Sequence, residues 1–252
     1  MKHIILLGSS YSTGKRIALD YGDDFNKYEN DINELNKLKN KQFSIATHAI
    51  EITSENWKDV IKTDSFFEGV ELVRNKSSFI KLLSNDKEVT SLDIANYILT
   101  QFNCTHTKLE KLTYFCYADY LCKYNKKLFN DKIYAFKYGP VVKSIYNKYK
   151  RSNYELYGNP EITIDEKNIE INKKYKMPVK SRIIASNDGI EKINSIDDTL
   201  KNYGQYNADT LIAITHKEGT PWTINDKGKK PYKEISDDDI LKYHKYEMNN
   251  LK

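Results

Sequence analysis

The chain of 252 residues has few cysteines and no long apolar run. Its 3 cysteines are an odd number, which argues against a disulfide framework. The longest apolar run near the N-terminus is Ile4-Ile5-Leu6-Leu7. Such a run is shorter than the ~7–15 residues of a signal peptide's apolar region or the ~20 residues of a membrane span. We therefore expect a cytoplasmic protein that does not engage a membrane.

Arginine is also scarce, with lysine supplying nearly all of the 40 basic side chains. Lysine, isoleucine, asparagine and tyrosine, whose codons are rich in A and T, make up 107 of the 252 residues. This composition is typical of a bacterium with a low-GC genome, or of its phages. The net charge of +5 can come from the same bias. Because phosphate-reading surfaces usually use the bidentate arginine fork, we expect weak or no nucleic-acid binding.

Charge is distributed unevenly along the chain. Residues 1–90 carry 13 basic and 14 acidic side chains, a net charge of −1, whereas residues 91–252 carry 27 and 21, a net charge of +6. Within the second part, residues 108–151 carry 11 basic and 3 acidic side chains. The change in net charge lies next to a polar stretch at 84–88 and predicts that the chain folds as two structural units. An apolar content of 39% allows each to bury a core.

Hydrophobic periodicity predicts a mixed α/β unit for residues 1–90. Short apolar runs indicate strands at His3–Leu7, Ala49–Thr53 and Val70–Val73. Patterns with helical spacing indicate helices at Asp31–Lys41, at Glu55–Lys62 after a Ser54 cap, and at Ser77–Leu83.

Residues 91–252 are predicted to be mainly helical, with a small β-hairpin formed by Glu161–Thr163 and Ile169–Ile171. Helices are expected over Ser91–Phe102, from a Thr107–Glu110 capping box to about Lys123, from Gly139-Pro140 onwards, and over Gly189–Tyr203, Asn207–His216 and Asp237–Glu247. The predicted fold class is therefore α+β: a small α/β N-terminal unit followed by a mainly α-helical domain.

Motifs for catalysis are weak. The loop Gly8–Arg16 suggests a phosphate-binding loop, but five residues separate Gly8 from Gly14 and Arg16 follows Lys15. A phosphate cradle needs four residues between the glycines and a Ser or Thr after the lysine. We interpret the loop as a turn between a strand and a helix, and the sequence also lacks G-x-S-x-G and H-E-x-x-H.

A zinc site built from Cys104, His106, Cys116 and Cys122 is also weakly supported. Cys116 and Cys122 lie six apart on one predicted helix, about 240° around its axis at ~100° per residue. Structural zinc sites use closer pairs, so buried free thiols are the better interpretation. His216 is expected to cap or pack a helix end. We therefore expect no enzyme, no catalytic residues, no metal and no cofactor.

An ordered series of motifs carries a family resemblance. It comprises the helix Ile94–Leu99, Leu109–Tyr114, Leu128–Asp131, Ala135–Val142, Leu211–His216 with Pro221-Trp222, and the acidic helix Ile235–Tyr243. In this series the chain resembles the Panacea domain family, also called SocA-like antitoxin or phage-associated GepA-like, over roughly residues 91–245. One departure is Glu110, where the family commonly has Gln. Residues 1–90 resemble no family that we can name.

The resemblance implies an antitoxin. Members of the family bind and neutralise unrelated toxins, including small-alarmone-synthetase-like toxins, and one type delivers its toxin to a protease. We therefore expect a cognate toxin encoded by an adjacent gene, bound directly by residues 91–252. The basic and aromatic segment 108–151 suits a protein interface as well as nucleic acid. The expected partner-binding residues are Lys108, Lys111, Tyr114, Lys137 and Lys143, with the four lysines exposed.

The remaining motif residues are expected to be structural. They are Leu112, Tyr138, Gly139, Pro140, His216 and Trp222, with Tyr138 packed across the Gly139-Pro140 turn. Three other functions stay open at this point: a phage or prophage factor that binds a host protein, a nucleic-acid-binding regulator that uses residues 108–151, and an enzyme that uses the Gly8–Lys15 loop.

Overall fold

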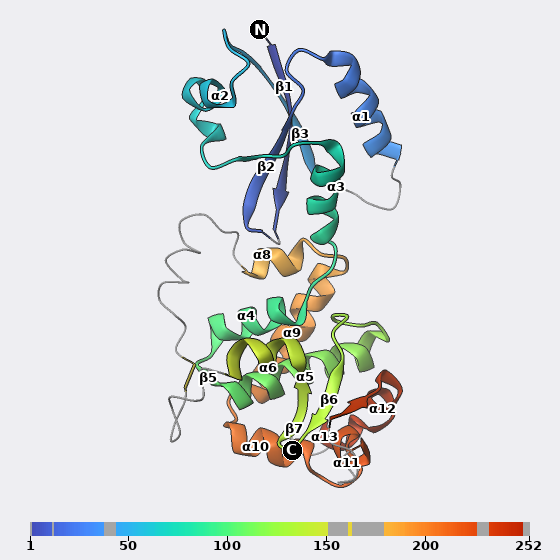
Figure 1. The fold of residues 1–252 in the computed structure, drawn as a ribbon. Helices are drawn as coiled ribbons and strands as arrows, with labels where there is room; N and C mark the ends of the chain where they lie inside the picture. Colours follow the sequence, from blue (N-terminus) through green and yellow to red (C-terminus); the bar gives the residue numbers. More distant parts are fainter. Residues whose placement is uncertain are drawn as a thin grey trace. The chain divides into compact units, whose positions relative to one another are not determined.

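The computed structural model describes residues 2–11, 13–37, 44–150, 161–162, 179–225 and 232–248. They form two compact units (Figure 1). The first comprises the described residues up to Glu88 together with Val179–Ala185, and the second comprises the other described residues. Among the described residues, no helix is both long enough and apolar enough to cross a lipid bilayer.

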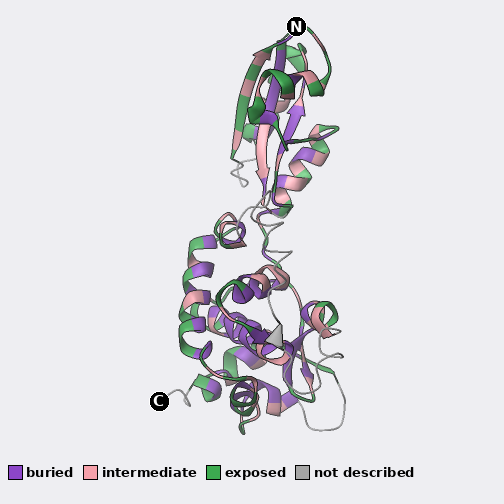
Figure 2. Cartoon of the chain, turned by 90° about the vertical axis from the view of Figure 1, so that its left-hand side faces the viewer, coloured by how far each residue is buried: buried purple, intermediate pink, exposed green. Residues whose placement is uncertain are grey.

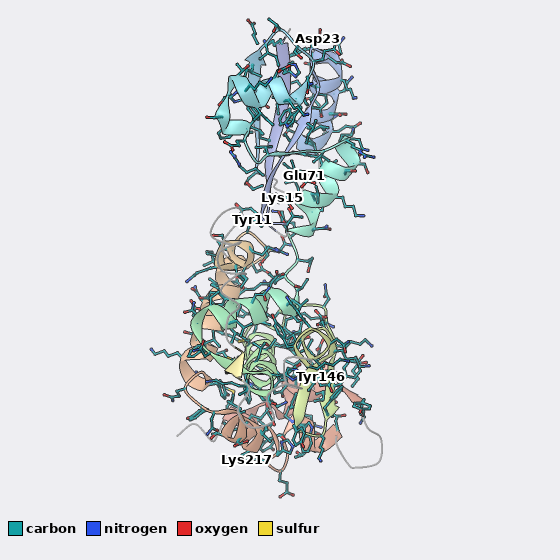
Figure 3. The ribbon with its side chains drawn as sticks, turned by 60° about the vertical axis from the view of Figure 1, so that its left-hand side comes forward. Tyr11, Lys15, Asp23, Glu71, Tyr146 and Lys217 are labelled. Atoms are coloured by element: carbon teal, nitrogen blue, oxygen red, sulfur yellow. The ribbon has the colours of Figure 1, made fainter. Side chains whose placement is uncertain are left out.

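The first unit is built on a four-stranded sheet of order β3-β1-β2-β4. The strands are β1 (Lys2–Ser10), β2 (Lys15–Asp20), β3 (Ile45–Glu51) and β4 (Glu71–Leu72). Strand β1 pairs antiparallel with β2 and β3, and β4 runs parallel to β2. The interpretation of Gly8–Arg16 as a turn before a helix is wrong, because β1 continues to Ser10 and β2 begins at Lys15. Lys15 is instead hydrogen-bonded to Glu71 at 2.6 Å across the sheet (Figure 3).

Helices cover both faces of this sheet (Figure 1). They are α1 (Phe25–Lys37), α2 (Trp57–Thr63) and α3 (Lys76–Asn85), with a short 3₁₀ helix, η1, at Ser65–Phe67. On one face, Leu6, Ile17 and Phe79 belong to a core that α1 and α3 close. On the other, Ile5, Ala18 and Phe67 belong to a core that α2 and η1 close. The two central strands are accordingly mostly buried (Figure 2).

A late segment of the chain completes this unit. Helix α8 (Val179–Ile184) carries Arg182, whose guanidinium is buried. It donates to the carbonyl oxygens of Asp86 at 2.8 Å and Asn85 at 3.2 Å, and also to that of Glu88. The last carbonyls of a helix have no partner within the helix, so Arg182 satisfies the end of α3. No local sequence pattern indicates that a segment after residue 91 joins the first unit.

Helix α5 (His106–Tyr124) is the centre of the second unit. Five helices pack against it: α4 (Ser91–Gln101), α6 (Lys143–Tyr149), α9 (Gly189–Tyr203), α10 (Ala208–Thr215) and α12 (Asp237–Tyr243). Because elements enclose it on several sides, residues all around α5 are buried, among them Leu109, Leu112 and Phe115. Leu112 and Trp222, two of the residues expected to be structural, are buried, and so is Leu109.

Two small antiparallel sheets belong to the second unit. One has the order β7-β6-β9, with β6 at Ile133–Phe136, β7 at Gly139–Val142 and β9 at Lys233–Ile235. The other pairs β5 (Cys104–Thr105) with β8 (Glu161–Ile162). The hairpin predicted over 161–171 lies outside the described residues from 163 onwards. The predicted α+β class, with a mainly helical second part, is confirmed.

Two predicted helix starts in this unit are wrong. Gly139-Pro140 begins strand β7, and α6 starts only at Lys143. The β-branched pair Val141-Val142 suits a strand, and proline is tolerated at the edge of a sheet. Helix α5 begins before Thr107, because the Thr105 side chain accepts the Lys108 N–H at 3.1 Å and caps it.

A buried charge network attaches the C-terminal helices to α5. His244 lies between α12 and α13 (Lys245–Met248), with Nε2 at 2.7 Å from Asp119 Oδ1 and Nδ1 at 2.6 Å from Glu247 Oε2. Tyr114 donates its hydroxyl to the same Glu247 oxygen at 2.9 Å. Both ring nitrogens face carboxylate oxygens, so both carry a proton. Burial disfavours the charged form of His244 and by itself lowers the pKa. The hydrogen bonds to Asp119 and Glu247, together with the negative charges of these two carboxylates, outweigh burial and raise the pKa of His244 to about 9.

Truncating the centre of α5 tests this packing. We expect Leu112→Ala to lower the free energy of unfolding by ~2–5 kcal/mol, because it leaves a cavity in a closed core. Urea denaturation measures the change. Leu241→Ala is the control, since Leu241 on α12 is 41% exposed and surface truncations usually change stability by about 0.5 kcal/mol or less. Equal effects of the two substitutions would contradict the packing around α5.

The stability supplied by His244 depends on pH. Its pKa is raised from 6.5 to about 9 on folding, so its contribution is fully present below pH 6.5 and is lost as pH rises through about 9. We expect His244→Gln to be destabilising near about pH 6 and the difference from wild type to shrink towards about pH 10. Urea denaturation across this range measures it, and any pH dependence common to both proteins cancels. A difference that stays constant with pH would show that folding does not raise the pKa of His244.

Candidate partner-binding site

The β6–β7 hairpin presents two exposed side chains at its tip, Lys137 and Tyr138. Tyr138 is 58% exposed, and the Lys137 ammonium lies 5.3 Å from the centre of its ring. The expectation that Tyr138 packs across Gly139-Pro140 is therefore wrong. Gly139 has a φ of +106°, which lets β7 fold directly back on β6. Residue 138 is left at the turn, outside the packed layers.

The backbone of this tip is fixed by side chains from the helices beneath it. Trp222, on α11 (Pro221–Asn225), donates its indole N–H to the Phe136 carbonyl at 2.8 Å. His216, which ends α10, has Nε2 at 3.3 Å from the Lys137 carbonyl and Nδ1 at 2.8 Å from the Ile212 carbonyl. The His216 and Trp222 rings are in contact, with centroids 3.6 Å apart. Both side chains thus hold the tip from inside the domain.

The backbone groups on the outer edge of β7 form hydrogen bonds with two neighbouring side chains of α5. Glu110 Oε2 accepts the Val142 N–H at 3.0 Å, and Lys111 Nζ donates to the Pro140 carbonyl at 2.8 Å. Pro140 has no N–H of its own, so it presents only an acceptor there. Strand β7 lies at the edge of its sheet. Glu110 and Lys111 supply the hydrogen bonds that a further strand would otherwise supply.

The expectation that Lys111 is exposed is wrong, because it is only 1% exposed. Burial lowers the pKa of Lys111 to about 7, and the charges of Glu110 and Glu247 oppose this shift. A Cβ at position 139 would lie 2.8 Å from both Lys111 Cε and Thr215 Oγ1. Glycine is therefore required at 139 both for its φ and for the close approach of Lys111.

Tyr114, the aromatic residue of the expected partner-binding set, is also fully buried. Its hydroxyl donates a hydrogen bond to Glu247, and the centre of its ring lies 5.4 Å from that of the Phe115 ring. Burial leaves neither Tyr114 nor Lys111 accessible to direct contact with a partner. The physical reason is the same for both residues: the elements around α5 come from distant parts of the chain and cover its polar as well as its apolar positions.

The lysines of the basic segment fall into two groups. Four are paired with carboxylates: Lys123 with Asp198 at 3.4 Å, Lys126 with Asp188 at 3.0 Å, Lys127 with Asp237 at 3.0 Å and Lys132 with Glu234 at 2.7 Å. Lys108, Lys137, Lys143, Lys148 and Lys150 lie over aromatic rings instead, and no carboxylate of the described residues is paired with them. Only the buried Lys111 belongs to neither group. The charges available to a partner are thus those of the five lysines that lie over rings.

An aromatic surface extends from the tip along β6. Tyr134 and Phe136 alternate along this strand and so lie on one face of it, with Lys143 Nζ 4.1 Å from the centre of the Tyr134 ring. The Phe136 ring is 5.2 Å from that of Tyr146 on α6, which Figure 3 marks, and 4.5 Å from that of Tyr232. We call the following residues the hairpin surface: Tyr134, Phe136, Lys137, Tyr138, Lys143, Tyr146 and Tyr232. Lys108 contacts Phe102 instead.

Two features of this surface escape sequence reasoning. Tyr232 precedes β9, far along the chain from the hairpin, and no local pattern places it beside Phe136. Tyr138 is visible in the sequence, but only the turn geometry shows that it is exposed. A Tyr-Gly-Pro string after an aromatic strand is the one local signal that could have identified this tip.

The thiols have no reactive environment. Cys104 and Cys116 are buried, Cys122 is exposed, and all three are free. Burial raises the pKa of Cys104 to about 11, so it stays a thiol near neutral pH. Within the described ranges, no group of three His, Cys, Asp or Glu side chains has an arrangement that could hold a metal ion.

Comparisons with known proteins identify a family for part of this chain. Residues 109–223 match the family described as Antitoxin SocA-like, Panacea domain. The chain is 24% identical over 151 residues to antitoxin SocA of Caulobacter vibrioides (strain NA1000 / CB15N), and the match covers 57% of this chain and 73% of that protein. No solved structure matches the chain. The matched range includes β6, β7, α10 and Trp222, which together build and hold the hairpin tip. Residues 109–223 are therefore a SocA-like Panacea domain, and the protein is a distant relative of antitoxin SocA.

Proposed function

We propose that this protein is an antitoxin that neutralises a cognate toxin, encoded by an adjacent gene, through direct binding and without turning over a substrate. The observation that carries the proposal is the Panacea domain at 109–223, in which the helices support an exposed hairpin tip. The domain is the one associated with antitoxins, and the tip gives it a surface suited to a protein partner.

The tip has the properties of a binding anchor. Tyrosine is enriched among the residues that dominate interface energies, because it buries a large rigid ring and keeps a polar end. Here the backbone beneath Tyr138 is already fixed by Trp222 and His216. Less conformational freedom is then lost on binding, which favours affinity. An exposed side chain on a held backbone is the arrangement that preorganised interfaces use.

Charge indicates the kind of partner surface. Lys137 and Lys143 lie against aromatic rings and have no carboxylate partner in the described part of the chain. An acidic surface on the toxin would complement them and accelerate encounter. We therefore assign the contact to the hairpin surface, with Lys108 as a more distant contributor. Lys111 acts from inside by holding β7.

Removing the anchor should weaken the complex. We expect Tyr138→Ala to raise the Kd for the toxin at least about tenfold, because a central anchor contributes ~2 kcal/mol or more. The change should lie mainly in the dissociation rate. Surface plasmon resonance with the product of the adjacent gene measures both rates. Unchanged binding by a folded Tyr138→Ala protein would place the interface elsewhere.

Reversing the charges should act on association. We expect Lys137→Glu with Lys143→Glu to slow association and to weaken its dependence on salt, with the fold intact. The matched control is Lys201→Glu, at an exposed position of α9. When each variant is co-expressed in cells with the adjacent toxin gene, the double variant should fail to protect the cells, whereas Lys201→Glu should protect them as the wild type does. If the adjacent gene product forms no complex with the wild-type chain, a phage factor that binds a host protein becomes the better function.

Nucleic acid should bind weakly. Four lysines of the basic segment are paired with carboxylates, which reduces the positive charge available to phosphates. We expect salt-sensitive binding no tighter than the ~10⁻⁴–10⁻⁶ M of non-specific contacts. Fluorescence anisotropy with labelled DNA and RNA at physiological salt measures it. Sub-micromolar affinity would favour a nucleic-acid-binding regulator instead.

A further inference from the structure

Strand β3 of the first unit has a neighbour on one side only. It pairs with β1 along its whole length, from Lys2 opposite Glu51 to Gly8 opposite Ile45. In the part of the chain that the structure describes, no strand lies on its other side. Alternate N–H and C=O groups on that side have no ladder partner, and such an edge is a template for another strand.

This edge lacks the devices that normally protect one. Residues Ile45–Ile50 contain no Lys, Arg, Pro or Gly, and the single charge of the strand is Glu51 at its end. The other edge strands that the structure describes are short or closed: β4 has 2 residues, and the outer side of β7 forms hydrogen bonds with Glu110 and Lys111. Among the described strands, an unprotected edge of 7 residues is therefore an exception.

Exposed aromatic rings flank this edge on both faces of the sheet. On one face, Tyr28 is hydrogen-bonded to Thr47 at 3.0 Å, and Phe25, 56% exposed, lies 5.9 Å from the Tyr28 ring. On the other, the His48 ring is stacked on Phe66 at 6.1 Å, and Phe66 is 49% exposed. A strand added beside β3 would place side chains next to both groups of rings.

We propose that the edge of β3 accepts an extended segment of a protein partner as a fifth strand of this sheet. Such binding takes its affinity from main-chain hydrogen bonds and its selectivity from alternate side chains. The segment should carry large apolar or β-branched side chains at every second position and no internal proline. It spans about seven residues, or roughly 23 Å at ~3.3 Å per residue.

A second copy of this chain is a poorer occupant. The exposed side chains of β3 at Ala46, Thr47 and Ala49 are small. Antiparallel pairing of two β3 strands centred on His48 would place His48 opposite His48, Thr47 opposite Ala49 and Ala46 opposite Ile50. On the face of the sheet that carries Tyr28 and Phe25, Thr47 would therefore gain only an alanine, whereas a different strand with large side chains on both faces would contact the rings on both.

Selection from a random peptide display library on the full chain tests this proposal. We expect enriched peptides to alternate large apolar side chains with other residues. Their Kd should rise at least about tenfold on Ala46→Lys/Ala49→Lys, which places charges along the edge. Asn30→Lys is the matched control, an exposed asparagine on α1. Enrichment without alternation, or equal binding to the edge variant and wild type, would overturn the proposal.

Backbone methylation gives a second test that needs no variant of the protein. An added strand uses the N–H groups of alternate residues. We expect N-methylation of an enriched peptide at one set of alternate residues to abolish binding, and at the other set to leave it nearly unchanged. Equal tolerance of both sets would show that the peptide does not pair as a strand. Because the probe is a peptide rather than the toxin, failure here leaves the antitoxin proposal standing, and failure of toxin binding leaves this one intact.

Discussion

The edge of strand β7 imposes a constraint that shapes the whole second unit. Its outer backbone groups are buried against α5, where an unpaired group would lose its hydrogen bond to water without replacement. Glu110 and Lys111 supply those bonds. Their charges must therefore face inward, the helix that carries them must lie at the centre, and residue 139 must be a glycine. The exposed tip follows from this, because the hairpin is held along its outer edge and beneath its turn.

Buried charges connect distant parts of this chain more than once. In the first unit, His3 has Nδ1 at 2.7 Å from Asp20 and Nε2 at 2.9 Å from the Ser54 carbonyl. Burial opposes its charge, but these hydrogen bonds raise the pKa of His3. In the second unit, the pKa of His244 is raised while that of Lys111 is lowered. The reason is the number of partners: His244 has two carboxylates, whereas the hydrogen bond of Lys111 goes to a neutral carbonyl.

The sheets that contain β3 and β7 treat their edges in opposite ways. Under the proposed function, the side chains that close the edge of β7 support Tyr138 and Lys137 for contact with a partner. The open edge of β3, flanked by Phe25 and Phe66, is suited to receiving a segment from one. An antitoxin that used both would contact a folded surface of its toxin through the second unit and an extended segment through the first. Mutations on either surface would then separate the two contributions.

The sequence by itself determined most elements and much of the core. Helix Gly189–Tyr203 has its predicted bounds, and Leu112 and Trp222, which the motif series marks as structural, are buried. The motif series also identified the domain. Rules based on local sequence fail where the same residues are compatible with both a helix and a strand. Proline suits both the first turn of a helix and an edge strand, so Gly139-Pro140 alone does not distinguish the predicted helix start from the observed strand β7.

Only the tertiary structure decided which side chains are accessible. Lys111 and Tyr114 look like surface residues of a basic, aromatic segment, yet elements from distant parts of the chain enclose them. Tyr232 joins Phe136, and Arg182 joins the end of α3, through contacts that no local pattern encodes. Sequence periodicity reports which face of an element is apolar. Whether a polar residue is also covered depends on how many other elements pack around it, and that number is set by the fold as a whole.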